Sequence, residues 1–252
     1  MMTAPASYDM FDITGRTFMV SGGAGAIGSG LVGALLDLGA NVVSLDRAAH
    51  PVAMAHANLL CLTGDATVAA DVEAAMQAAL ARFGMVHTLV NAAGINIRSS
   101  VADMRMEDLL AVMNVNLNTA VLLSQAFARI EGGEGRSIVN IASIAGTFGI
   151  VGAAAYCTSK AAMISFTQVC ALEWAARGIR VNAIAPSAIR TPMMAPRLND
   201  PAQAAGLLAK IPLGRIGEPS DVVGPIVFLA SKSASWITGH VLTVDGGRTA
   251  TA

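Results

Sequence analysis

The sequence predicts one α/β domain with a doubly wound parallel sheet of seven strands, flanked by helices. Apolar runs of strand length alternate with helix-length segments along all 252 residues. Several of these runs lack a period-two pattern, which is typical of strands that helices cover on both faces. No linker, repeat or low-complexity segment interrupts the alternation, so we expect a single domain over residues 1–252.

The elements follow in order along the chain. The expected strands are Thr17–Ser21, Asn41–Leu45, Leu59–Leu62, Val86–Val90, Ser137–Ile141, Arg180–Ala185 and Val241–Val244. The expected helices lie near 26–38, 67–83, 103–130, 151–177 and 219–230. Strands and helices that take turns predict βαβ units. Residues 191–217 break the rhythm with four prolines, and we expect them to form a lid over the site.

The composition limits the partners. Charged residues make up only 13%, against roughly 25% in an average soluble protein. Such a surface predicts that other subunits cover some apolar faces. The helix at 151–177 carries three charges, so we expect it to be buried on every side, by the sheet and by a second subunit. The net charge of -1, without a basic stripe, argues against nucleic acid.

Location is predicted from the N-terminal composition and the cysteines. The N-terminus lacks the basic segment followed by an apolar core that is typical of a signal peptide, and no apolar run has the pattern of a membrane span. We therefore expect a cytoplasmic protein without membrane contact. Cys61, Cys157 and Cys170 show no disulfide spacing, which predicts a reducing compartment. We expect Cys61 and Cys170 to be small core residues.

A glycine-rich turn follows the first strand. In Ser21–Gly28 the pattern Gly23-x-Gly25-x-x-Gly28 lies between a strand and a helix. Glycines there allow a tight turn, and backbone N–H groups at the helix N-terminus bind a pyrophosphate. The turn therefore predicts a Rossmann-like dinucleotide site.

Residues at the ends of the next strands predict the rest of that site. Asp46 ends the second strand, where a carboxylate accepts hydrogen bonds from ribose hydroxyls and repels a 2′-phosphate. Arg47 leaves NADP open, but Asp46 favours NAD. Asp65 and Ala66 follow the third strand, where Asp65 faces the adenine. The small residues Asn91, Ala92, Ala93 and Gly94 follow the fourth strand, where the cofactor must pass close to the backbone.

Tyr156 and Lys160 lie four residues apart and share one face of a helix. A free tyrosine has a pKa of about 10, and a nearby lysine and a cationic nicotinamide both favour the phenolate. Lowering the pKa by about 3 units requires about 4 kcal/mol. Ser143 ends the fifth strand, where its hydroxyl can bind the substrate oxygen. This group predicts proton transfer coupled to hydride transfer.

Rival chemistries find little support. The four histidines are scattered and no pair has metal-ligand spacing, so we expect no metal. Ser143 lacks the Gly-x-Ser-x-Gly pattern of a hydrolase.

Together these motifs resemble the short-chain dehydrogenase/reductase family over nearly the whole chain. Its glycine motif is matched by Ser21, Gly22, Ala26, Ile27 and Gly28, its Asn-Asn-Ala-Gly motif by Asn91–Gly94, and its ending by Asp245–Gly247. Four residues depart from the family pattern: Ala26, His87, Ala92 and Ser187.

The resemblance implies roles for further residues. It implies a catalytic tetrad of Asn116, Ser143, Tyr156 and Lys160, in which Asn116 holds a water that links Lys160 to solvent. Gly22, Gly25, Ala26, Ile27 and Gly28 would then hold the pyrophosphate. Pro186, Ile189 and Thr191 would meet the nicotinamide, and Lys160 its ribose. Similar enzymes are homotetramers packed through their two long helices.

The substrate is the least determined part. Asn96 and Arg98 follow the fourth strand in a segment similar to that of gluconate 5-dehydrogenases. We therefore expect Arg98 to bind a sugar acid or polyol, with Ser143 and Tyr156 on its reacting oxygen. An apolar set made of Ile144, Phe148, Ile150 and Val151 favours instead a 3-oxoacyl, cyclic or aromatic ketone. A third possibility is an NAD-binding sensor or scaffold without turnover.

Overall fold

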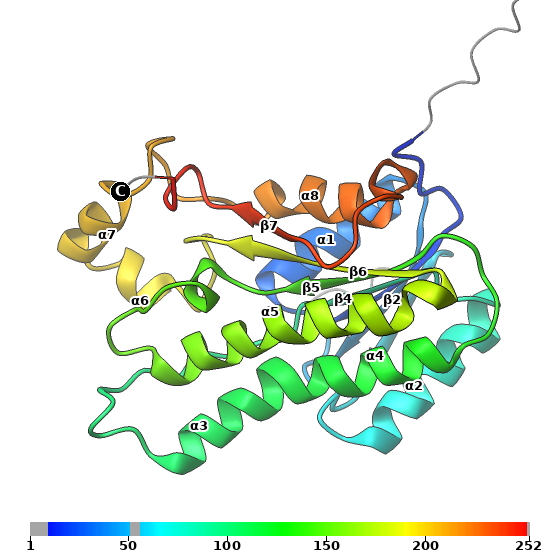
Figure 1. Cartoon of the computed structure of the whole chain (residues 1–252), viewed down its shortest axis with the longest axis horizontal. Helices are drawn as coiled ribbons and strands as arrows, with labels where there is room; N and C mark the ends of the chain where they lie inside the picture. The colour runs from blue at the N-terminus through cyan, green and yellow to red at the C-terminus, as the bar shows by residue number, and fades with distance from the viewer. Residues whose placement is uncertain (1–9, 51–55, 251–252) are drawn as a thin grey trace, which may run out of the picture.

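The computed structural model describes residues 10–50 and 56–250, and its core is a parallel seven-stranded sheet in the order β3-β2-β1-β4-β5-β6-β7 (Figure 1). The strands are β1 (Thr17–Ser21), β2 (Asn41–Asp46), β3 (Leu59–Thr63), β4 (Thr88–Asn91), β5 (Arg136–Ile141), β6 (Ile179–Pro186) and β7 (Val241–Val244). This topology confirms the predicted fold class.

Helices cover both faces of the sheet (Figure 1). The helices are α1 (Ala26–Asp37), α2 (Ala69–Phe83), α3 (Met106–Met113), α4 (Thr119–Arg129), α5 (Ala154–Trp174), α6 (Ala195–Leu198), α7 (Pro201–Leu208) and α8 (Ser220–Ala230). Phe18 and Val20 of β1 pack against α1 and α8, whereas Met19 between them packs on the side of α2, α4 and α5. Successive side chains of a strand point to opposite faces, so β1 contributes to both cores.

The long helix expected at 103–130 is interrupted. A π-helical turn, Asn114–Asn118, separates α3 from α4 and carries the fully buried Asn116. Single π turns inside helices are frequent at functional sites because they shift the direction of one side chain. Residue spacing alone does not show the extra residue in such a turn, so the sequence predicted one regular helix.

The segment Met106–Arg129 is also long and apolar enough to cross a membrane by length and composition. In the structure Leu123 and Phe127 of this segment are fully buried against the sheet.

One expectation about burial is corrected. Cys61 is exposed because β3 is the edge strand, whereas Cys170 is buried as expected. The sheet covers one side of α5, and Val169 and Leu172 are 48% and 82% exposed in the single chain. The second subunit expected to cover them stays a prediction.

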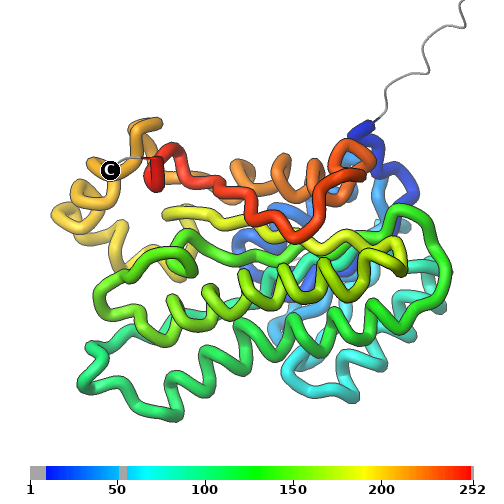
Figure 2. Tube along the Cα trace, in the orientation of Figure 1, coloured from blue at the N-terminus to red at the C-terminus, as the bar shows by residue number. Residues whose placement is uncertain are grey.

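The lid segment (residues 191–217) contains α6 and α7 and lies beside the end of the chain (Figure 2). The backbone N–H of Leu213 donates to the carbonyl of Gly246 at 3.1 Å. Residues that follow β7 and those of the lid therefore meet near the carboxyl ends of the strands, where open α/β sheets bind their ligands.

Candidate active site

The glycine turn between β1 and α1 has no room for side chains. Gly22 has a φ of +70°, and a Cβ there would lie 2.8 Å from the Cα of Ala93. A Cβ on Gly28 would lie 2.1 Å from the carbonyl oxygen of Gly22. The backbone of β1, the turn and the segment after β4 thus approach closely at the N-terminus of α1, as a pyrophosphate site requires.

A cavity of about 300 Å³ continues from this turn over the ends of β2, β3 and β4. Its lining includes most of the residues expected to hold the adenosine half of a dinucleotide: Gly22, Gly25, Asp46, Arg47, Asp65, Ala66, Ala92, Ala93 and Gly94. Small side chains and a few polar groups fit such a ligand. Ala26 and Gly28 support the turn without lining this cavity.

The carboxylate of Asp46 is held in place at the end of β2. It accepts hydrogen bonds from the backbone N–H groups of Ala24 and Ala48, both at 3.0 Å. Arg47 is 70% exposed, and its guanidinium lies 3.6 Å from the carboxylate of Asp65. The Asp46 side chain is thus fixed by the glycine turn, whereas the Arg47 side chain lies at the rim of the cavity.

Asp65 has its own local partners. Its carboxylate accepts hydrogen bonds from the side chain and the backbone N–H of Thr67, and these bonds hold the pKa of Asp65 below its usual range. A charged carboxylate therefore faces the cavity at neutral pH.

Asn91 differs from its expected role. Its side-chain amide is buried and donates to Asn140 at 2.8 Å and to Ser124 at 3.2 Å, and it does not line the cavity. The structure thus uses Asn91 to join β4 to β5 and α4, and leaves the cofactor cavity to its three neighbours, Ala92, Ala93 and Gly94.

Ser143 and Tyr156 line a second cavity, next to the first. Ser143 follows β5, and its hydroxyl accepts a hydrogen bond from the backbone N–H of Ala145 at 3.1 Å. Tyr156 lies in the first turn of α5. Pro186, Ile189 and Thr191 line the same cavity, as expected for residues that meet a nicotinamide.

Lys160 lies one helical turn beyond Tyr156 and is buried. Its ammonium group donates to the carbonyl of Ile141 at 2.7 Å and lies 5.7 Å from the centre of the Tyr156 ring. Burial lowers the pKa of Lys160 to about 8.

The environment of Tyr156 corrects one expectation. Burial raises the pKa of Tyr156, and a hydrogen bond with Ser143 acts in the opposite direction without cancelling it. The protein alone therefore keeps the phenol protonated. The positive charge of an oxidised nicotinamide would favour the phenolate when it lies in this cavity.

Asn116 is nearly saturated with protein partners. Its amide accepts from the N–H of Ile95 at 2.7 Å and donates to the Ile95 carbonyl at 3.0 Å and to Ser159 at 2.9 Å. A Cβ on Gly94 would lie 3.5 Å from Asn116 Oδ1 and 3.7 Å from Lys160 Nζ. Asn116 thus fixes the segment after β4 beside Lys160, and one acceptor lone pair stays available for a water.

The substrate side of this cavity is part polar and part apolar. Arg98 and Asn96 line it, and Asn96 Oδ1 is buried with no partner among the described residues. Ile144 and Ile150 line it as well, but Phe148 and Val151 line an adjoining outer cavity instead. The predicted apolar wall is therefore split between two cavities.

Residues of the lid segment contribute to the lining, as expected for a site with walls from residues 94–99, 144–154 and 187–210: Met193, Met194, Arg197 and Leu207. Sequence reasoning missed Arg248, which comes from the residues after β7. Its position carries no periodic pattern that points to the cavity.

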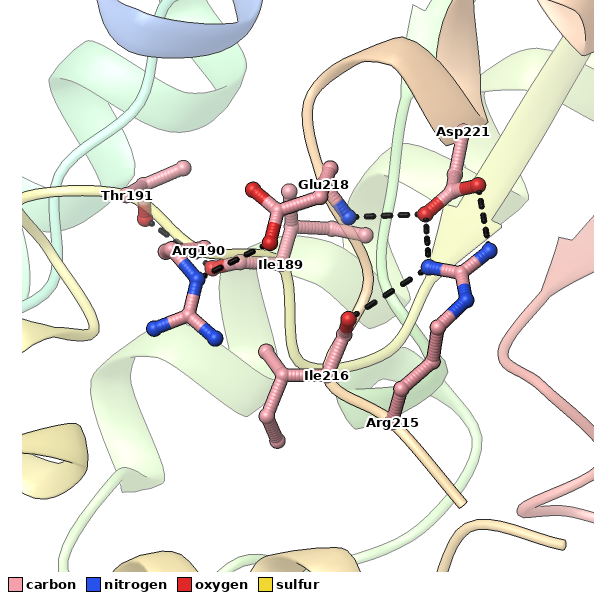
Figure 3. Close-up of polar contacts among 7 residues, drawn as sticks. All are labelled: Ile189, Arg190, Thr191, Arg215, Ile216, Glu218 and Asp221. Carbon is pink, nitrogen blue, oxygen red and sulfur yellow. Dashed lines mark hydrogen bonds and ion pairs between the residues drawn. The ribbon is translucent and has the colours of Figure 1, made fainter. Parts of the chain in front are cut away.

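The two ends of the lid segment are tied together at its base (Figure 3). Ile189 and Gly217 form a β-bridge, and Arg190 donates to Glu218 at 2.9 Å. Arg215 forms a bidentate pair with Asp221 at 2.6 and 2.8 Å, which lowers the pKa of Asp221 to about 2. These contacts form the base of a closed loop over the cavity.

No group of three or more His, Cys, Asp or Glu residues that could hold a metal occurs within residues 10–50 and 56–250. The site consists of a cavity at the glycine turn and, next to it, a cavity lined by Ser143 and Tyr156, with the buried Lys160 beside the tyrosine.

Comparison with known proteins agrees with this geometry. A family model described as enoyl-(acyl carrier protein) reductase matches residues 13–249. The 2-dehydro-3-deoxy-D-gluconate 5-dehydrogenase of Escherichia coli K12 is 34% identical over 94% of this chain and 96% of its own. The D-threitol dehydrogenase of Mycolicibacterium smegmatis is 34% identical over 95% of each chain.

Solved structures show the same likeness. The gluconate 5-dehydrogenase of Burkholderia cenocepacia J2315, solved in complex with NADP and tartrate, superposes with a TM-score of 0.91. It is 30% identical, and the match covers 98% of this chain and 100% of that one. The chain belongs to the short-chain dehydrogenase/reductase family.

Proposed function

We propose that this protein transfers a hydride between NAD and a secondary alcohol or ketone of a sugar acid or polyol. One observation carries the proposal: Ser143, Tyr156 and Arg98 line one cavity beside the dinucleotide cavity. The named activities of the relatives, on a deoxy-gluconate derivative, a tetritol and a gluconate, support the same substrate class.

Each protein group has a defined task. Tyr156 takes the hydroxyl proton of the alcohol as a general base, or donates it to the ketone in reduction. Ser143 donates a hydrogen bond to the same substrate oxygen and stabilises charge that develops there. A bound nicotinamide supplies the hydride chemistry.

Lys160 places a buried positive charge near the phenol. Because its ammonium group stays bonded to the Ile141 carbonyl, this charge keeps a fixed position. It stabilises the phenolate while the proton is on the substrate side or in solvent.

The choice of NAD rests on Asp46. Its carboxylate is fixed by two backbone N–H groups, so it cannot turn away from a 2′-phosphate without breaking both hydrogen bonds. The guanidinium of Arg47 already lies 3.6 Å from the carboxylate of Asp65, which offsets part of its positive charge toward a phosphate. These contacts favour a cofactor with a free ribose hydroxyl.

The decisive experiment measures turnover with NAD and NADP on a panel of sugar acids, polyols and secondary alcohols, for the wild type and Asp46→Asn. We expect the wild type to prefer NAD. Asp46→Asn removes the negative charge and should raise kcat/KM with NADP by about 10-fold. Asp37→Asn at the end of α1 is the matched control. A wild type that prefers NADP would refute the assignment of NAD.

An apolar ketone is the second candidate. Ile144, Ile150, Met193 and Leu207 give the cavity a substantial apolar wall. This wall would suit a 3-oxoacyl, cyclic or aromatic ketone, and turnover of such ketones with no activity on sugar acids would favour it.

We also propose a homotetramer. Large apolar side chains are exposed on two separate faces of the chain. Leu110 of α3 and Leu172 of α5 are 62% and 82% exposed, and Trp236 near β7 is 98% exposed. Exposed apolar residues on two faces suit a dimer of dimers. Light scattering should give four times the mass of one chain, and Leu172→Glu should yield a smaller species.

A further inference from the structure

Three arginines line the substrate cavity, and the protein treats them differently. Arg98 follows β4, Arg197 belongs to α6 in the lid segment, and Arg248 lies beyond β7. Ser143 and Tyr156 line the same cavity, and no aspartate or glutamate of the described residues does. What each arginine can do for a ligand depends on the partners that it already has.

Arg248 is held and partly neutralised by the protein. It donates to the Ser187 hydroxyl at 3.2 Å and lies 5.6 Å over the centre of the Phe148 ring. Its charge also interacts with that of Asp245, outside the cavity lining. These partners orient its guanidinium and offset part of its charge.

Arg98 is tied to the loop that precedes α5. Its Nη2 donates to the Val151 carbonyl at 2.6 Å. Nη2 and Nε lie 3.4 and 4.0 Å from the position that a Cβ on Gly152 would take, and the N–H of Ser99 donates to the Gly152 carbonyl at 3.2 Å. One edge of the guanidinium therefore faces this loop, so Arg98 helps to hold the chain that leads to Tyr156.

Arg197 has no such partner. It is half-buried, and it forms no hydrogen bond and no ion pair within residues 10–50 and 56–250. Burial lowers its pKa, and the charges of Arg98 and Arg248 act in the same direction. A half-buried guanidinium without an acceptor is unfavourable, so a ligand that supplies one gains binding energy there.

Other partly buried arginines show how the chain usually treats such a group. Arg16, Arg136 and Arg180 each donate to a backbone carbonyl at 2.7 Å. Arg197 is the exception in the described chain, and it is an exception at the cavity that holds Ser143. The missing acceptor is therefore expected on the substrate.

We propose that Arg197 binds a carboxylate of the substrate, which makes the substrate a sugar acid and not a neutral polyol. This inference rests on the proposed function and narrows its substrate class. A carboxylate accepts two parallel hydrogen bonds from one guanidinium, which satisfies Arg197 and offsets its charge. The sequence predicts this role for Arg98, but the contacts of Arg98 with the loop before α5 favour Arg197.

The test compares three substrates that share one carbon chain. D-gluconate, D-glucitol and D-glucitol 1-phosphate carry a carboxylate, a hydroxyl and a phosphate at the same end. We expect kcat/KM to be at least about 10-fold higher for gluconate than for the other two. Equal kcat/KM for gluconate and glucitol would overturn the proposal and leave the dehydrogenase activity standing. A preference for the phosphate would overturn the choice of a carboxylate.

Variants of Arg197 locate the effect. Arg197→Met should raise KM for gluconate by about 10-fold to 100-fold with kcat within threefold, and its effect on glucitol should be at least about 10-fold smaller. Arg197→Lys should recover part of the loss, because a lysine supplies the charge without the fork of two donors. Arg129→Met, at the exposed end of α4, is the control. A rise in KM of the same size for both substrates would refute the role of Arg197.

Arg98→Met separates the two arginines. Because Arg98 holds the loop before α5, its loss should lower kcat/KM for gluconate and for glucitol by similar factors. If Arg98→Met acts on gluconate alone while Arg197→Met acts on neither substrate, the carboxylate is bound by Arg98 and the proposal is wrong.

A binding measurement separates this proposal from the proposed function. Calorimetric titration with D-gluconate in the presence of NADH, which cannot oxidise it, should show binding that Arg197→Met weakens at least about 10-fold and that rising salt reduces. If such binding occurs while no alcohol is turned over, the carboxylate site stands and the proposed function fails. If gluconate does not bind the wild type, or binds Arg197→Met equally well, the carboxylate site fails.

Discussion

The cofactor cavity and the substrate cavity lie side by side at the carboxyl ends of the strands, but different kinds of groups line them. The first is lined mainly by backbone and by glycine and alanine residues at the ends of β1 to β4. The second is lined by long side chains, among them Met193, Met194, Arg197 and Arg248.

This difference has a physical reason. A pyrophosphate is bound by backbone N–H groups, so its site needs close approach of main chain and tolerates few side chains. A substrate is distinguished by charge and shape, which side chains supply. The fold therefore determines the cofactor side, and a few residues in loops determine the substrate side.

The largest effect is expected at the border of the two cavities. Tyr156→Phe removes the hydroxyl that exchanges the proton and keeps the ring, so kcat should fall by about 10³-fold to 10⁴-fold. Because the adenosine cavity does not include Tyr156, the affinity for NADH, measured by fluorescence, should change little. A kcat within tenfold of the wild type would mean that another group transfers the proton.

A glycine variant tests the backbone-lined side. In Gly28→Ala the new methyl group meets the Gly22 carbonyl at 2.1 Å, so the turn must move. We expect a loss of about 1–3 kcal/mol in the free energy of unfolding and at least a 10-fold weaker affinity for NADH.

The matched control lies on the same helix. Nothing lies within 4 Å of a Cβ on Gly33, so Gly33→Ala should raise the free energy of unfolding by about 0.5–1 kcal/mol and preserve NADH binding. If both variants behave alike, steric exclusion at the turn is not the cause.

His87 lies at the amino ends of the central strands β1 and β4, opposite the cavities, and should affect stability without affecting either cavity. Its Nδ1 accepts a hydrogen bond from the backbone N–H of Thr17 at 3.0 Å, and burial with the charges of Arg16 and Arg136 lowers its pKa. A lowered pKa means that the stability contributed by neutral His87 is present above pH about 6.5 and is lost as the pH falls through the folded-state pKa.

His87→Ala should therefore cost about 1 kcal/mol at pH 7.5 and flatten the dependence of Tm on pH between 5 and 7. Thermal unfolding across this range checks both expectations. An unchanged dependence of Tm on pH would show that another group titrates in this range. A changed KM for the substrate at pH 7.5 would show that His87 influences the active site.

The smallest effect is expected at the base of the lid segment. The pair of Asp221 with Arg215 is 31% and 56% exposed, so Asp221→Asn should lower the free energy of unfolding by less than about 1 kcal/mol. The pKa of Asp221 is about 2, so the pair contributes at neutral pH and is lost below pH about 4. KM for the substrate should change by less than about threefold, and steady-state kinetics at pH 7.5 measures it. A larger rise in KM would mean that the base controls the lid.

The sequence by itself determined the sheet and the location of most of the site. Buried parallel strands need unbroken apolar runs, and the glycine turn follows from local backbone conformation. Both features therefore depend only on residues that are consecutive in the sequence. The spacing of Tyr156 and Lys160 follows from the period of one helix, and the structure confirms that they lie on one stretch of α5.

Only the tertiary structure decided the contacts made between distant segments. The π turn that carries Asn116, the inward side chain of Asn91 and the raised pKa of Tyr156 all depend on neighbours far along the chain. The same holds for the meeting of Arg98, Arg197 and Arg248. Such contacts depend on how loops pack at the edge of the sheet, which no local period encodes.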